Sequence, residues 1–222
     1  MLLRLTIGVL SLIVLLFSLS AQSYDRKFPD RIDPAKRYMF YMHGTYVERV
    51  GPLENYHYYD ILDAIAAKDI VVIGEARSLT QVGIYARTIA RQVQQLLDAG
   101  VPSYQITVAG HSKGGMITMT VATLMAKPGI NYVVFAGCGL PGNEYLRGYR
   151  KFVEAEAKGI EGNFLIAWAA DDEIAGNCDL AMQKGKADYV NKVLPAGLGG
   201  HKIFYNANPV WLDELVNFAK GG

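Results

Sequence analysis

The sequence has almost no excess of charge of either sign. Its 222 residues include 22 Lys and Arg against 21 Asp and Glu, a formal net charge of +1. No basic run alternates with aromatic residues, and no internal repeat or low-complexity tract follows the N-terminal segment. A broad surface for nucleic acid or an acidic partner needs a positive excess, so we expect no nucleic-acid partner. The length suits one α/β domain with a sizeable core.

Long hydrophobic runs are missing except at the N-terminus. There a short, weakly positive segment precedes an almost wholly apolar run over residues 5–19, and Ser18 and Ser20 are small residues where a signal peptidase reads. This pattern predicts a secretory signal peptide over residues 1–20 and a mature, secreted or periplasmic domain over residues 21–222, with no membrane contact after cleavage. The alternative is an uncleaved membrane anchor, because the run is close to the lower limit for a span.

Cysteine is scarce, with only Cys138 and Cys178 in the chain. Both follow predicted strands, and an even number of cysteines outside the cytosol suggests a disulfide. Successive strands of a sheet are usually neighbours, which would bring the two thiols to one rim. The alternative is a pair of free buried thiols. Neither flanking sequence resembles an activated catalytic cysteine.

Short β-branched runs alternate with helical patterns about six times along the chain. The runs lack polar alternation, which is typical of strands covered on both faces. We therefore expect an α/β fold, a three-layer sandwich with a mostly parallel sheet of about six strands and helices on both faces. The predicted strands are 37–42, 69–73, 105–109, 131–136, 163–169 and 189–194, and the predicted helices are 56–68, 80–99, 116–126, a weaker one within 143–158, 179–184 and 210–220.

The pentapeptide Gly110-His111-Ser112-Lys113-Gly114 has the form G-x-S-x-G, with a predicted strand before it and a helix after it. In that context the serine lies on a sharp strand-to-helix turn with its hydroxyl above the sheet, and side chains at the two glycine positions would collide with neighbouring backbone. The pentapeptide also occurs by chance in glycine-rich chains, but the flanking elements favour a nucleophilic Ser112.

A serine nucleophile requires a base, and imidazole suits this role near neutral pH. Of the four histidines, His43 and His111 flank backbone near the expected site and are interpreted as loop-ordering residues. His57 stands among tyrosines at a helix start and is interpreted as a packing or surface residue. His201 follows the last strand in a glycine-rich loop and is the candidate base, the alternative being an exposed loop histidine.

The base needs a carboxylate partner. The segment Ala170-Asp171-Asp172-Glu173 directly follows a predicted strand, and the order Ser…Asp…His is that of α/β-hydrolases. We favour Asp172 over Asp171 because a small residue stands three positions before it and an apolar one two positions after it. The alternative for these acids is a helix N-cap role.

Two backbone donors are needed for an oxyanion hole. The N–H of Lys113 at the helix start is one candidate, and the N–H of Thr45, in His43-Gly44-Thr45 after the first strand, is the other. Ligands of parallel sheets bind at the carboxyl ends of the strands, and the candidate residues follow such ends. We expect no metal ion and no cofactor.

At these positions the chain resembles the α/β-hydrolase family over essentially all of its mature length, and more narrowly a group of small exported bacterial α/β-hydrolases. The resemblance implies a Ser112–His201–Asp172 triad and supports a Cys138–Cys178 bridge. The two antiparallel strands that open the larger family fold are not evident, so a trimmed sheet is expected. The matching segments are His43-Gly44-Thr45 and residues 110–115, 136–139, 172–178 and 197–205.

The sequence says less about the identity of the substrate than about the catalytic residues. Roughly 25 residues separate the fourth and fifth strands, too few for a cap domain, so we expect an open site. Hydrolysis of a small carboxylic ester through an acyl-enzyme is the leading hypothesis; the alternatives are a thioesterase, an amidase or peptidase, or an inactive binding protein of the same fold, and the oligomeric state stays open. Further candidates for contacts with substrate are Tyr46, Tyr56, Tyr58 and Tyr59, which are otherwise core residues, and Glu75 and Arg77.

Overall fold

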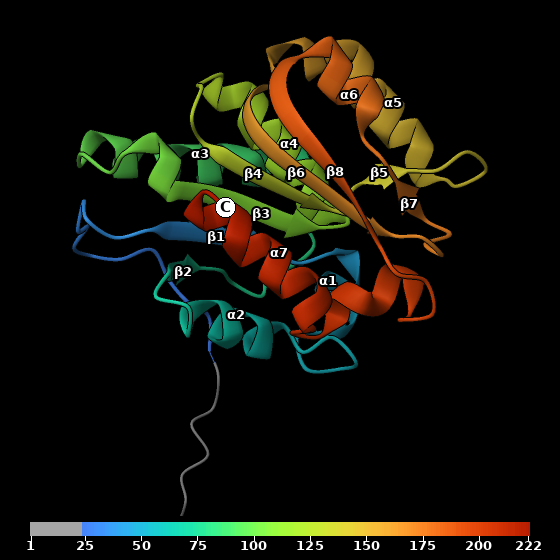
Figure 1. Ribbon diagram of the computed structural model, residues 1–222, viewed down its shortest axis with the longest axis horizontal. Coiled ribbons are helices and arrows are strands. Elements are labelled where there is room, and N and C mark those ends of the chain that lie inside the picture. The colour runs from blue at the N-terminus through green and yellow to red at the C-terminus, as the bar shows by residue number, and fades with distance from the viewer. Residues whose placement is uncertain (1–23) are drawn as a thin grey trace, which may run out of the picture.

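A computed structural model describes residues 24–222 (Figure 1). They form a six-stranded sheet of order β2-β1-β3-β4-β6-β8, in which every neighbouring pair is parallel. The expected signal segment, residues 1–20, lies outside the described residues. The strands of the sheet are β1 (Tyr38–Met42), β2 (Val71–Ile73), β3 (Ile106–His111), β4 (Asn131–Phe135), β6 (Glu161–Ala169) and β8 (Lys186–Leu194).

Helices cover both faces of the sheet and make two separate hydrophobic cores. Residues alternate between the two cores along each strand, as Phe40 and Tyr41 do in β1, because successive side chains of a strand point to opposite faces. One face is covered by α3 (Val82–Asp98), α4 (Lys113–Met125), α5 (Tyr145–Ala155) and α6 (Asp179–Lys184), and the other by α1 (Thr45–Val50), α2 (Tyr58–Ala66) and α7 (Pro209–Lys220). The predicted three-layer α/β class is confirmed, with α7 lying across the sheet in Figure 1.

The six predicted strands are all present, with boundaries shifted by a few residues. Helix α4 begins at Lys113, three residues earlier than predicted, because Ser112 is its N-cap. Helix α1 was not predicted. At the β2 edge, the antiparallel pairing within the described residues is a single bridge between Arg26 and Gly74, so the sheet is trimmed as expected.

The segments that follow β4 and β6 are joined twice. The short strands β5 (Cys138–Gly139) and β7 (Ala175–Gly176) pair antiparallel, and a disulfide links Cys138 to Cys178, with an S–S distance of 2.01 Å. The expected bridge is therefore present. Short 3₁₀ helices lie at Ser103–Gln105, Ala157–Gly159 and Gly200–Tyr205, the last named η3. Within residues 24–222, no helix has the length and apolar character to cross a membrane.

Candidate active site

Ser112 sits at a strained turn between β3 and α4. Its φ is 56° and its ψ is −116°, a positive φ that residues other than glycine rarely adopt. The Ser112 N–H donates to the carbonyl oxygen of Phe135 in β4 at 2.8 Å. Such strain persists only where the surroundings enforce it, and it clusters at functional sites.

The two glycines of the pentapeptide are sterically required. A Cβ at Gly110 would lie 2.4 Å from the backbone of Gly114, and a Cβ at Gly114 would lie 2.1 Å from the carbonyl oxygen of Met42. Both distances are far below a real Cβ contact, so the predicted collision is confirmed. The turn is thereby packed against the end of β1 as well as against its own helix.

His201 and Asp172 form a hydrogen-bonded pair. His201 Nδ1 lies 2.9 Å from Asp172 Oδ2, and the Asp172 carboxylate is fully buried. Asp172 Oδ1 accepts the N–H groups of Ile174 and Ala175 at 2.8 and 2.9 Å, so the backbone fixes its orientation. Asp171 instead accepts the N–H of Gly197 at 2.9 Å. Because Asp172 occupies Nδ1, Nε2 is the ring nitrogen of His201 that is left to serve a reacting group.

Ser112 and His201 line the same cavity. It is the smaller of two cavities that Ser112 borders, with a volume of about 170 Å³ against about 700 Å³, and it is also lined by Tyr46, Val50 and Tyr205. The ring of His201 lies 4.6 Å from that of His111, the residue before Ser112. The structure therefore brings the three predicted side chains, Ser112, Asp172 and His201, to one place although they come from three different loops.

The two predicted backbone donors are the first residues of two helices. Thr45 begins α1 after its N-cap Gly44, and Lys113 begins α4 after its N-cap Ser112. The first N–H groups of a helix have no partner inside the helix and carry the positive end of its dipole. A Cβ at Gly44 would lie 3.1 Å from the Cβ of Ser112, so the loop after β1 closely approaches the serine. Thr45 and Ser112 share both cavities of the site.

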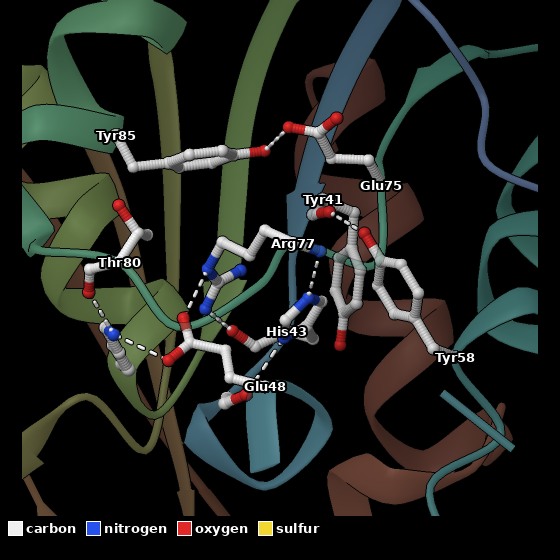
Figure 2. A network of polar contacts seen from close by, with 10 residues as sticks. Tyr41, His43, Glu48, Tyr58, Glu75, Arg77, Thr80 and Tyr85 are labelled. Carbon is white, nitrogen blue, oxygen red and sulfur yellow. Dashed lines mark hydrogen bonds and ion pairs between the residues drawn. The ribbon is translucent and has the colours of Figure 1, made fainter. Parts of the chain in front are cut away.

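A buried carboxylate that the sequence did not indicate joins these two helices (Figure 2). The side chain of Glu48, in α1, has no exposed surface and pairs with Arg77 Nε at 2.8 Å and with Lys113 Nζ at 2.6 Å. Lys113 Nζ also donates to the carbonyl oxygen of Thr80. The Arg77 guanidinium donates to the carbonyl oxygen of His43. One acid therefore ties together the loops that follow β1, β2 and β3.

The remaining histidines have structural surroundings. His43 Nε2 accepts the N–H of Arg77 at 3.0 Å, and Nδ1 donates to the carbonyl oxygen of Gly44 at 2.9 Å. Burial, followed by the charge of Arg77, lowers the pKa of His43 to about 3, and burial holds the pKa of His111 well below its usual value. His57 is half exposed beside Asp60, which agrees with the surface interpretation.

Most of the further candidates for substrate contacts lie away from the cavities at Ser112, and the alternative interpretation of Tyr56 and Tyr58 as core residues is the one the structure agrees with. Tyr56 and Tyr58 are fully buried in the core and form no rim; of the four tyrosines considered, Tyr46 lines the smaller cavity. Arg77 is buried in the Glu48 network, and Glu75 accepts the hydroxyl of Tyr85. Neither lines a cavity at Ser112.

Two tyrosines that line the site were missed. Tyr205 lies four residues after His201 within the segment that carried the resemblance, whereas Tyr145 comes from α5 and has no sequence signal. Within residues 24–222, no group of three or more His, Cys, Asp or Glu side chains is placed to hold a metal ion.

No protein-family model matches the chain, and no curated protein matches it in sequence. Solved structures do match. An S-formylglutathione hydrolase from Agrobacterium tumefaciens is 13% identical with a TM-score of 0.57, covering 83% of this chain and 84% of that one. Esterase 2 of Thermogutta terrifontis, phosphonylated by sarin, is 15% identical with a TM-score of 0.52 over 87% and 88%. A puromycin-hydrolyzing peptidase of Mycobacterium tuberculosis is 17% identical with a TM-score of 0.51 over 83% and 34%. These likenesses show that the chain shares the fold of these hydrolases.

Proposed function

We propose that this chain, which has the α/β-hydrolase fold, is a serine hydrolase that cleaves carboxylic esters of small molecules through an acyl-enzyme on Ser112. The observation that carries the proposal is the His201–Asp172 hydrogen bond of 2.9 Å beside a cavity that Ser112 and His201 share. A hydroxyl at a strained turn, an imidazole and a buried carboxylate are the three groups that this chemistry needs.

In the first half of the reaction, Ser112 Oγ attacks the ester carbonyl while His201 Nε2 takes the serine proton. Asp172 keeps the proton of the neutral ring on Nδ1 and stabilises the imidazolium that forms. The carbonyl oxygen becomes an oxyanion, which the N–H groups of Thr45 and Lys113 stabilise. The bond to the leaving oxygen then breaks, and the alcohol departs with the proton from His201 Nε2.

In the second half, water replaces the alcohol. His201 Nε2 takes a proton from the water as its oxygen attacks the acyl carbon, and a second oxyanion forms between the same two donors. When the bond to Ser112 Oγ breaks, the serine recovers its proton from His201 and the free acid leaves. Every proton is accounted for within the triad, the substrate and the attacking water.

The same triad would cleave thioesters and amides. The neighbour described as a puromycin-hydrolyzing peptidase keeps peptidase activity as the second candidate. The proposal treats residues 21–222 as one domain without a cap, since β5, α5 and a 3₁₀ helix are the elements between β4 and β6. It also places the mature chain outside the cytosol, because disulfides such as Cys138–Cys178 persist in oxidising compartments.

The proposal is tested with p-nitrophenyl acetate and a fluorophosphonate probe, which reacts only with an activated serine. Wild-type protein should be labelled and should turn over the ester. Ser112→Ala should abolish labelling and lower turnover by roughly a thousandfold or more. Ser103→Ala is the matched control, because Ser103 lies at the opposite end of β3; it should behave as wild type. An unlabelled wild-type protein would instead identify an inactive binding protein.

A further inference from the structure

Ser112 lies between two cavities of very different size. The larger has a volume of about 700 Å³ and runs along α4 and α5, whereas the smaller has a volume of about 170 Å³. Sites for drug-sized ligands usually occupy roughly 300–1,000 Å³. The larger cavity falls within this range and the smaller one below it, so the larger cavity offers more room for the bigger half of a substrate.

The chemistry assigns the smaller cavity to the alcohol. In the proposed reaction the leaving oxygen receives its proton from His201, so the alcohol must lie on the side of that ring. His201 borders the smaller cavity and does not border the larger one. The rings of Tyr46 and Tyr205, whose centroids are 5.2 Å apart, form part of its wall and limit its size.

The acyl group is then left with the larger cavity. Its buried lining is mainly apolar, with Ala136, Tyr149 and Phe152 beside the hydroxyl side chain of Thr120. Lys113 of this lining is paired with Glu48, whereas the other charged side chains, among them Arg147 and Lys151 of α5, belong to exposed residues. An acyl chain extending from Ser112 would therefore meet apolar side chains inside and charges at the mouth.

We infer that the substrates are esters of a large, mainly apolar acid with a small alcohol. This inference rests on the proposed function and adds the direction in which the ester binds. A single methylene in a hydrophobic pocket changes kcat/KM by roughly 10–200-fold. Two cavities of such different size should therefore distinguish two esters that differ only in which side of the ester carries the longer chain.

Ethyl hexanoate and hexyl acetate make this comparison directly, because they are isomers. The six-carbon chain belongs to the acid in ethyl hexanoate and to the alcohol in hexyl acetate. Hydrolysis is followed by acid release in a pH-stat, with ethyl acetate as the short reference. The kcat/KM for ethyl hexanoate should exceed that for hexyl acetate by at least about tenfold, the lower end of the effect of one methylene.

A substitution in each cavity tests the assignment separately. Gly148 lines the larger cavity, and a Cβ built there meets no atom within 4 Å, so Gly148→Phe puts a ring into the space. It should lower the ratio of ethyl hexanoate to ethyl acetate turnover by at least about fivefold. Arg150→Phe, on the same helix but outside that lining, should leave the ratio unchanged. Tyr46→Ala widens the smaller cavity and should raise hexyl acetate turnover relative to its isomer.

The outcomes are distinct. If all three esters are hydrolysed through Ser112 but hexyl acetate is the equal or better isomer, the assignment of the cavities is wrong and the serine hydrolase stands. If none is hydrolysed and the fluorophosphonate labels nothing, the proposed function fails and this inference fails with it. A preference for ethyl hexanoate that Gly148→Phe does not reduce would also overturn the inference, because the acyl group would then lie elsewhere.

Discussion

Glu48 is the residue whose removal should cost the most among the charged side chains near the site. Its carboxylate has no exposed surface and lies between Arg77, with 3% of its side chain exposed, and Lys113, with 16% exposed. Glu48→Gln keeps the size of the side chain and removes its charge. Two buried cations then face each other without a counter-charge.

The magnitude follows from the burial of the group. Removing one partner of a buried ion pair typically destabilises a protein by about 3–5 kcal/mol, because the remaining charge stays desolvated. For a chain of this length such a loss lowers Tm by roughly 6–20 °C. Lys113→Met should cost less than Glu48→Gln, since it leaves Glu48 with Arg77 as a balanced pair.

The assay is urea unfolding, read as a change in the midpoint at constant m-value. The matched control is Glu214→Gln, which breaks the pair of Glu214 with Lys192, whose side chains are 34% and 46% exposed. Exposed pairs contribute roughly 0–1 kcal/mol, so the control should barely move the midpoint. If Glu48→Gln costs no more than Glu214→Gln, or less than Lys113→Met, the charge argument is refuted.

Two further predictions concern the stability of the fold at low pH and without the disulfide. Stability should decline as the pH falls below about 6.5, because His43, with its pKa lowered to about 3, and His111, whose pKa is also lowered, stay neutral in the folded chain and take up protons on unfolding. An unfolding midpoint in urea that is the same at pH 5 and pH 8 would contradict this. Replacing Cys138 and Cys178 together by serine opens a loop spanning 40 residues and should cost roughly 4 kcal/mol by chain entropy. Equal urea midpoints for the double variant and the wild type would contradict it.

The strands, and the site residues that follow them, could be predicted because each strand leaves a local pattern of apolar residues in the sequence. A buried parallel strand such as β4 is a continuous apolar run, and the residue that follows it is found at the carboxyl edge of the sheet. Ser112, Asp172 and His201 could be placed at that edge without knowing any contact. The choice of Asp172 over Asp171 rested on neighbouring residue types, and the structure places Asp172 against His201.

Contacts between loops were not predictable in this way. Helix α1 has six residues, too few to show a helical period, so Glu48 gave no sign that it is buried. Its partners Arg77 and Lys113 come from loops distant in sequence. The sequence left open which of the tyrosines are buried for a similar reason. The hydroxyl of Tyr58 donates to the carbonyl oxygen of Tyr41 at 2.7 Å, and such a partner, which allows a tyrosine to be buried, cannot be seen in composition.

The turn at Ser112 could be predicted from the pentapeptide, whereas the burial of Glu48 could not, and the difference has one physical origin. The strained φ of Ser112 costs roughly 1–3 kcal/mol and survives because it is enforced from several sides. Gly110 and Gly114 allow backbone contacts that no side chain permits, and the Ser112 N–H is held by Phe135. Only glycine permits such close contacts, so the glycines in the sequence indicate the geometry of the turn. A buried carboxylate between two cations can be supplied from any loop that reaches them. A turn that is fixed by close backbone contacts therefore leaves a local pattern of glycines in the sequence. A turn that is fixed by a buried ion pair leaves no such pattern.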